Sequence, residues 1–342
     1  MSVRFISKEP SLDDYWRGII LFGRNVASYK FALAKSLLEL RPEGGDLLKL
    51  QELAPVYAGY LCEHLKHSDK QITSKSSGFL DGCRKYNSGV ITKDELVALT
   101  VRDGFNNVID AFHIVGQEEI PRRFYFDERK NNAGIRLSDE FSALLENQQS
   151  VNLPVEVEAR WRLVETAWEL GIARNLVTVD YDAETESLFA IDRAKRRKSV
   201  TGSRDALNGY QKGQCFYCFS DIYINASASL YPDVDHFFPH RLAQMDFGAN
   251  IDGIWNLVLS CQECNRGVGG KSDRIPTIRL LERLNTRNEF LISSHHPLRE
   301  TLMLQTGAST QQRRAFLNDV HDKARAALIH TWEAEERGLP KF

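Results

Sequence analysis

Four of the six cysteines form two pairs with the spacing of metal ligands. Two residues separate Cys215 from Cys218, and two residues separate Cys261 from Cys264. This spacing lets both sulfurs of a pair reach one ion, and four thiolates favour a closed tetrahedral Zn²⁺ site that performs no chemistry. The sequence therefore predicts a structural zinc site that closes the intervening residues into a loop.

The enclosed loop carries residue types that a plain zinc ribbon lacks. Asp235 and His236 are adjacent, so both side chains serve one site only if the chain bends there. A later strand-like run carries Asn256, and Asn265 follows the last cysteine. An imidazole with a pKa of about 6.5 is a general base at physiological pH, and carboxylate and amide oxygens suit a hard ion such as Mg²⁺. This set is typical of metal-assisted phosphodiester hydrolysis.

Residues 203–275, about a fifth of the chain, resemble the HNH nuclease family, in the subgroup whose final His is replaced by Asn. The resemblance implies a ββα-metal fold, in which a two-stranded hairpin and a helix hold one catalytic Mg²⁺ or Mn²⁺ ion beside the scissile phosphate. It also implies His236 as the general base, Asp235 and Asn265 as ligands of that ion, and Asn256 as a brace that orients His236. The matching segments occur in family order: Gly213-Gln214-Cys215-Phe216-Tyr217-Cys218, Val234-Asp235-His236, Trp255-Asn256-Leu257 and Cys264-Asn265-Arg266-Gly267.

Other residues of this segment have more than one interpretation. His240 could touch phosphate or cap the hairpin, and Lys271 could contact a phosphate or stay in solvent. Asp233 is interpreted as a solvated residue at the edge of a strand. Three glycines between Asn265 and Lys271 predict that the helix after the second cysteine pair is interrupted. Two cysteine pairs alone are also typical of a zinc-stabilised binding module with a dead site.

The charge is unevenly distributed along the chain. Residues 1–192 carry 23 Lys and Arg against 30 Asp and Glu, a net charge of −7, whereas residues 193–342 carry 21 against 16, a net charge of +5. A basic run just before the first cysteine pair would neutralise backbone phosphates without reading sequence. The alternatives are a solvated linker and a contact with the acidic half. The residues expected to bind DNA phosphates are Lys195, Arg196, Arg197, Lys198, Arg204, His240, Arg266 and Lys271.

The predicted fold class is mainly α. Residues 1–192 are expected to form an acidic, mainly helical regulatory or partner-binding domain, and residues 193–275 the basic segment and the zinc-stabilised nuclease domain. Residues 276–342 are expected to be helices that pack on the nuclease domain. Apolar periodicity and capping signals predict the individual elements. These are helices over 11–38, 46–66, 92–114 with a break near Gly104, 138–146, 155–170, 278–292 and 309–336, and a hairpin of 176–181 with 187–191.

Composition excludes several classes of protein. No uninterrupted apolar run approaches the roughly 18 residues of a membrane span, and the N-terminus lacks the apolar core of a signal peptide. Cys62 and Cys83 are interpreted as buried reduced thiols, which suits a cytoplasmic location. Residues 1–192 contain neither a nucleotide-binding phosphate loop nor an HExxH motif, so the chain is not expected to hydrolyse nucleotides.

The sequence as a whole predicts a metal-dependent DNA endonuclease. HNH nucleases joined to helical domains resemble effectors of bacterial restriction and anti-phage defence, which act with a separately encoded helicase, ATPase or sensor protein. An RNA-directed or strand-nicking HNH enzyme stays open, because the catalytic core contacts backbone rather than base edges. One such centre cuts one strand at a time, so an oligomer also stays open.

Overall fold

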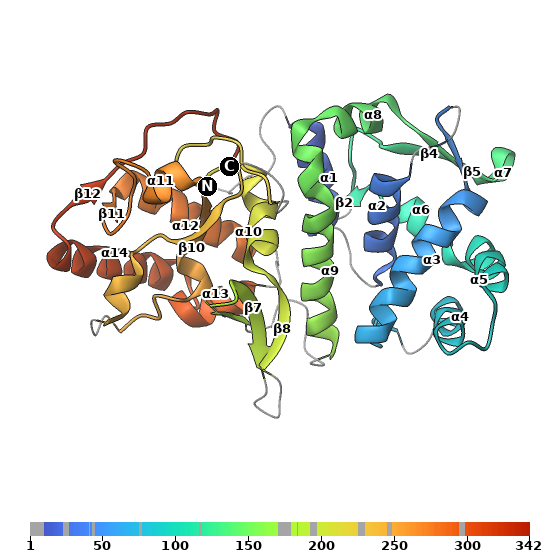
Figure 1. Cartoon of the computed structure of the whole chain (residues 1–342), viewed down its shortest axis with the longest axis horizontal. Coiled ribbons are helices and arrows are strands. Elements are labelled where there is room, and N and C mark those ends of the chain that lie inside the picture. Colours follow the sequence, from blue (N-terminus) through green and yellow to red (C-terminus); the bar gives the residue numbers. More distant parts are fainter. Residues whose placement is uncertain are drawn as a thin grey trace. The chain divides into compact units, whose positions relative to one another are not determined.

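The structure is a computed structural model of the whole chain (Figure 1). It describes residues 10–22, 27–40, 42, 45–74, 77–115, 118–169, 179–182, 184–191, 197–224, 230–244, 248–293 and 298–342. The chain divides into two compact units. The N-terminal unit is Glu9–Gly171, and the C-terminal unit contains Ile172–Phe342. Among the described residues, no helix is both long and apolar enough to cross a membrane.

The N-terminal unit is mainly helical, as the sequence predicts. Its three-stranded antiparallel sheet has the order β1-β5-β4, from Leu47–Lys49, Gly134–Leu137 and Tyr125–Glu128. A two-residue pair, β2 (Ile114–Val115) and β3 (Glu118–Glu119), lies outside that sheet. The helices are α1 (Leu12–Phe22), α2 (Tyr29–Glu39), α3 (Leu50–His67), α4 (Gly78–Asn87), α5 (Lys93–Leu99), α6 (Val108–Ala111), α7 (Arg129–Asn132), α8 (Asp139–Glu146) and α9 (Leu153–Glu169).

The core of this unit forms where α2 packs against α3 and α9. Helix α2 is buried along most of its length, because apolar residues occupy nearly every position between Phe31 and Leu38. Phe31 stacks on Trp161 of α9 with a ring-centroid distance of 6.0 Å. Full burial of one such side chain stabilises a fold by roughly 1.5–3 kcal/mol. Removal of apolar surface from water therefore holds these three helices together.

Two charged side chains inside this core, Arg17 and His64, are paired with carboxylates. The Arg17 guanidinium contacts Asp13 at 2.5 Å and Glu156 at 2.8 Å. His64 lies flat on Trp161, with ring centroids 3.5 Å apart, and its two ring nitrogens contact carboxylates on α9. Pairing is required because an isolated buried charge costs several kcal/mol.

Several predicted elements of this unit need correction. The predicted single helix over 11–38 is two helices, since Ala27 pairs with Ile72 as an isolated bridge and interrupts the helical pattern. The segment predicted as one helix over 46–66 consists of strand β1 followed by helix α3. The break near Gly104 is confirmed, because α5 runs into a π-helical turn that ends there. Helix α4 and strands β4 and β5 were not predicted, since their apolar patterns are short.

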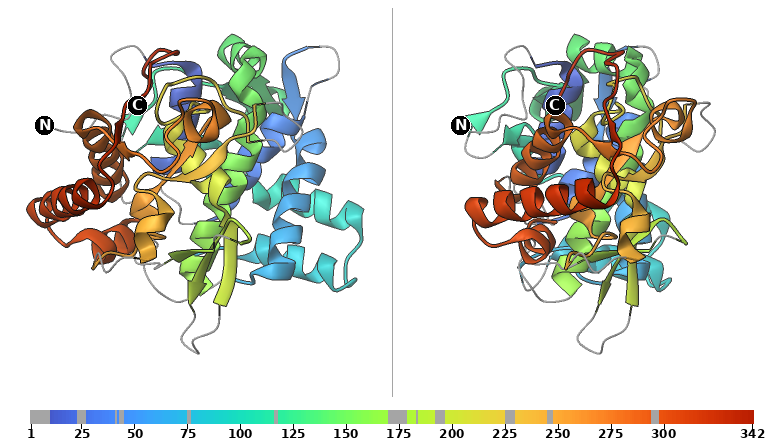
Figure 2. Two further views of the ribbon diagram at one scale, coloured as in Figure 1. Left: turned by 60° about the vertical axis from the view of Figure 1, so that its left-hand side comes forward. Right: turned by 90° about the vertical axis from the view of Figure 1, so that its left-hand side faces the viewer.

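The C-terminal unit contains three small sheets and five helices among its described residues. Helices α12, α13 and α14, orange to red in Figure 2, lie against one another. Its strands are β6 (Val179–Asp182), β7 (Ser187–Ile191), β8 (Arg197–Gly202), β9 (Asp233–His236), β10 (Leu257–Ser260), β11 (Ile275–Pro276) and β12 (Thr331–Trp332). Its helices are α10 (Ser203–Gln211), α11 (Gln262–Arg266), α12 (Ile278–Ser293), α13 (Arg299–Thr306) and α14 (Thr310–Ala327).

The predicted hairpin is confirmed, with β6 antiparallel to β7, and β8 extends it to three strands. This sheet belongs to the C-terminal unit, so the division of the chain falls at Gly171 rather than at residue 192. The predicted final helix ends at Ala327 instead of Glu336, because Thr331–Trp332 pairs in parallel with Ile275–Pro276. Helix α12 contacts the 3₁₀ turn of Ile254–Asn256 before β10, since Arg287 and Asn288 donate to the Trp255 carbonyl at 2.9 and 3.2 Å.

The His64 contacts predict a pH dependence of stability. Burial disfavours the imidazolium, but hydrogen bonds to Glu158 and Glu165 outweigh burial and raise the pKa of His64 above its ordinary value. A raised folded-state pKa gives stability that is complete below pH of about 6.5 and is lost as the pH rises through the raised value. We therefore expect the urea-unfolding free energy of the wild type to fall above pH 6.5 more steeply than that of His64→Gln.

The matched control is His67→Gln. His67 lies three residues further along α3, and its pair with Glu63 is exposed to solvent. This variant should keep the wild-type pH slope. Equal slopes for the wild type and His64→Gln would contradict the assignment.

Candidate active site and cysteine cluster

Strands β9 and β10 and helix α11 form a compact strand-strand-helix arrangement in the C-terminal unit (Figure 1). The strands are antiparallel, with His236 opposite Leu257 and Asp235 opposite Val258. All four residues of β10 are buried, which fixes the register of β9 against it. Helix α11 follows at once and ends at Arg266, before the glycines that were predicted to interrupt it.

The four cysteines of the two pairs lie together. Their sulfurs all lie within 4.8 Å of one another, and those of Cys218 and Cys261 are 3.8 Å apart. A regular tetrahedron with Zn–S distances near 2.3 Å has sulfurs about 3.8 Å apart. Cys261 also caps α11, because its sulfur accepts the Cys264 N–H at 3.4 Å. The cluster therefore fits a closed zinc site.

A C-terminal arginine faces this cluster. Nη2 of Arg337 lies 3.2 Å from the sulfurs of Cys218 and Cys261 and 3.3 Å from that of Cys264. The backbone N–H groups of Arg337 and Gly338 donate to the Cys218 carbonyl at 2.8 and 3.0 Å. Only glycine fits at position 338 without a steric clash, since a Cβ there would lie 2.0 Å from the Phe219 carbonyl oxygen. The residues after β12 thus place one cation beside thiolates whose complex with Zn²⁺ is an anion.

We expect Arg337→Gln to weaken zinc binding, because the guanidinium donates to three sulfurs and offsets their negative charge. Partners of this kind typically contribute 10–100-fold in metal affinity, and we expect about that loss in a competition titration with a chromogenic chelator.

Arg325→Gln, at an exposed position of α14, is the control and should bind zinc like the wild type. Wild-type zinc affinity of Arg337→Gln would rule out a role for this contact in holding the ion.

His236 lies on one face of β9 in a half-buried position. Its Nε2 is 2.9 Å from Oδ1 of Asp252, and the same oxygen is 3.3 Å from Nε2 of His240. Tyr181 of β6 contacts the His236 ring at its edge, with centroids 6.0 Å apart. Burial lowers the pKa of His236 below its ordinary value, although the Asp252 charge opposes that shift. His236 is therefore a neutral imidazole at physiological pH.

Asp252 was not predicted as a site residue. The signal available in the sequence was an acidic residue four positions before Asn256, within the loop that the cysteine pairs enclose. Nothing in that spacing places its carboxylate on His236. The 3₁₀ turn of Ile254–Asn256 and the loop before it bring the two side chains together.

Asp235 points away from His236, as alternation along a strand requires. Its Oδ2 accepts the Tyr217 hydroxyl at 2.6 Å, and its Oδ1 lies 3.2 Å from the Lys271 ammonium. Burial raises the pKa of Asp235 even though Lys271 and Tyr217 favour the carboxylate. Both interpretations of Lys271 need correction, because its side chain is only 1% exposed and also donates to the His236 carbonyl at 2.9 Å.

The two asparagines have separate contacts. The buried Asn256 amide donates to the carbonyls of Phe238 and Ile251 and accepts the Phe238 N–H, so it braces the loop that follows β9. Asn265 donates to the Asp233 carboxylate at 3.0 Å. Asp233 is thus not a solvated strand-edge residue, since its side chain is 19% exposed and contacts α11.

Oxygen donors for a hard ion are present near this helix. A carboxylate has about four lone-pair sites, and Tyr217 and Lys271 use two of those on Asp235. The amide oxygen of Asn265 accepts no hydrogen bond from any residue that the structure describes. Asp235 and Asn265 therefore offer the oxygen donors that Mg²⁺ or Mn²⁺ prefers, but Asp235 lies buried on the face of β9 opposite His236.

The residues predicted to bind DNA phosphates differ in availability. Arg266 and His240 are exposed although they contact Asp233 and Asp252, whereas Arg204 pairs with Glu186, donates to the Pro232 carbonyl and covers the Tyr231 ring. The backbone of Arg197 and Lys198 belongs to β8, so these two residues are part of a sheet and not of a linker. Lys195 and Arg196 lie outside the described residues.

No family model, curated protein or solved structure matches this chain.

Proposed function

We propose that the C-terminal unit is a metal-dependent HNH endonuclease that hydrolyses phosphodiester bonds of DNA. The observation that carries this proposal is the pairing of a half-buried, neutral His236 with Asp252 at the end of a strand-strand-helix arrangement. The arrangement is held by the cysteine cluster on one side and by the Asn256 amide on the other.

His236 is the general base in this proposal. Its Nε2–H donates to the Asp252 carboxylate, which leaves Nδ1 as the acceptor for a proton from the attacking water. The carboxylate also stabilises the imidazolium that proton transfer creates. Asp252 is therefore a positioning residue, because it acts through His236 and not on the phosphate.

Asp235 and Asn265 would hold the catalytic ion. When bound, a hard divalent ion neutralises the charge that develops on the phosphate oxygens. Lys271 keeps the buried Asp235 carboxylate compensated and ties it to the backbone of His236. The exposed side chains of Arg266 and His240 suit the DNA backbone. The basic run before α10, the defence role, the cytoplasmic location and the separately encoded partner stay predictions.

The direct test is cleavage of supercoiled plasmid with added Mg²⁺ or Mn²⁺. We expect His236→Ala to lower the cleavage rate by about 10²–10⁴, because a positioned general base contributes that much. Zinc content should not change, since His236 is not part of the cysteine cluster.

His330→Ala, at an exposed position between α14 and β12, is the control and should cut at the wild-type rate. Unreduced cleavage by His236→Ala would refute the role of His236. A wild-type protein that retains zinc but cuts no plasmid with either ion would favour the binding module instead.

The His236–Asp252 contact predicts a shifted pH profile. The Asp252 charge raises the pKa of an imidazole that burial has lowered, so Asp252→Asn should lower that pKa further. Because cleavage requires the neutral base, the acidic limb of the rate profile should move to lower pH. The plateau should fall by up to about 100-fold, because the base is less well oriented.

Asp273→Asn is the matched control, since Asp273 is exposed and pairs with Arg241 rather than with a histidine. An acidic limb that stays in place in Asp252→Asn would show that Asp252 does not act on His236.

A further inference from the structure

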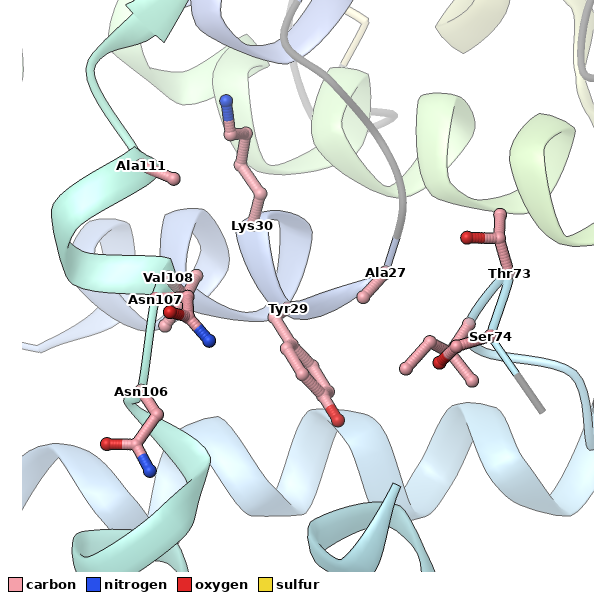
Figure 3. A pocket seen from close by; sticks show the side chains of 10 residues that line it. Ala27, Tyr29, Lys30, Thr73, Ser74, Asn106, Asn107, Val108 and Ala111 are labelled. Carbon is pink, nitrogen blue, oxygen red and sulfur yellow. The ribbon is translucent and has the colours of Figure 1, made fainter. Parts of the chain in front are cut away.

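The N-terminal unit contains a pocket of about 290 Å³ to which the proposed nuclease activity assigns no role (Figure 3). It lies between the first turn of α2, residues 72–74 and the turn that leads into α6. Most of its wall is apolar, from Ala27, Ile72, Val108 and Ala111. Its size is near the lower limit of small-molecule sites, which span about 300–1,000 Å³.

Two side chains of α2 give the two ends of the pocket different chemical character. Figure 3 shows that Tyr29 and Lys30 leave the first turn of α2 in opposite directions, with a phenol ring at one end and an ammonium group at the other. The Tyr29 hydroxyl is 2.6 Å from the Ser77 hydroxyl, which fixes the ring. A ligand is therefore offered an aromatic surface at one end and a positive charge at the other.

Few groups near the Lys30 ammonium offset its positive charge. The residue is only 6% exposed, and its one hydrogen bond goes to the Ile114 carbonyl at 3.3 Å. No carboxylate among the described residues lies within ion-pair distance of it, whereas Lys35, five residues further along α2, contacts Glu158 at 2.6 Å. Burial lowers the pKa of Lys30 to about 8, so the group is still mostly charged at pH 7.

An unpaired buried ammonium is costly, and the buried Arg17 and His64 of this unit are paired with carboxylates. The nearby His113 cannot compensate Lys30, because burial and the charges of Arg123 and Lys30 lower its pKa to about 3 and keep it neutral. An anionic ligand would supply the missing partner. A single cation matches a monoanion, and a carboxylate accepts from one ammonium without the further donors that a phosphate dianion requires.

We propose that this pocket binds a small aromatic carboxylic acid, with its carboxylate at the Lys30 ammonium and its ring between Val108 and Tyr29. The amides of Asn106 and Asn107 border the same space and would meet polar substituents on the ring. Asn107 has a left-handed backbone, with φ of 69°, which places its side chain at the start of α6. The proposal is independent of nuclease activity, because all the residues involved belong to the N-terminal unit.

The experiment is calorimetric titration of the full chain with benzoate and with benzamide, which has the same ring but no charge. We expect benzoate to bind with a dissociation constant on the order of 0.1–1 mM, as suits so small a ligand. Benzamide should bind at least about tenfold more weakly, because it lacks the charge-assisted hydrogen bond.

Lys30→Met is the decisive variant and should weaken benzoate binding at least about tenfold. It removes an unpaired buried charge while keeping the side-chain volume, so its melting temperature should not fall below that of the wild type. Lys66→Met is the control, since Lys66 is exposed on α3 and pairs only with Glu63. Ala111→Trp, at an exposed position, should fill the pocket and abolish binding of both ligands.

Equal affinity for benzoate and benzamide would overturn the proposed role of the charge. Wild-type benzoate binding by both Lys30→Met and Ala111→Trp would place the ligand elsewhere and overturn the site. The ligand class would be overturned if the wild type bound no benzoate at concentrations up to about 20 mM, which is 20-fold above the upper end of the expected range.

Discussion

The convergence of four sulfurs is the constraint on which the C-terminal unit depends. Cys218 and Cys261 are 43 positions apart in the chain, and their sulfurs are 3.8 Å apart in space. Closing so long a loop restricts the unfolded chain strongly, and for a metal-linked loop the free energy of metal binding is also folding free energy. The loop contains all of β9 and β10, so the register that places Asp235 and His236 is set within it.

Strand geometry separates the two residues that the sequence places side by side. Asp235 faces inward to Tyr217 and Lys271, whereas His236 faces Asp252 and Tyr181. Lys271 links the two faces, because its ammonium contacts the Asp235 carboxylate and the His236 carbonyl. A buried acid and a half-buried base thus have separate surroundings within one short strand, and burial shifts their pKa values in opposite directions.

The N-terminal unit shows how charge is tolerated in an apolar core. Arg17 and His64 each contact two carboxylates, and these contacts tie α1, α3 and α9 together. Lys30 breaks this pattern at the edge of a pocket. Unlike Arg17 and His64, Lys30 contacts one carbonyl and no carboxylate among the described residues.

The sequence by itself determined features that depend on local spacing. These are the two cysteine pairs, the helices with strong caps such as α8 and α14, the hairpin of β6 and β7 and the mainly α class. Only the tertiary structure decided which face of β9 each side chain occupies, that Asp252 contacts His236, and that Lys271 is buried rather than solvated. It also ended the last helix at Ala327 and brought Arg337 to the sulfurs. These features depend on contacts between residues far apart in the chain, and hydrophobic periodicity carries no signal for such contacts.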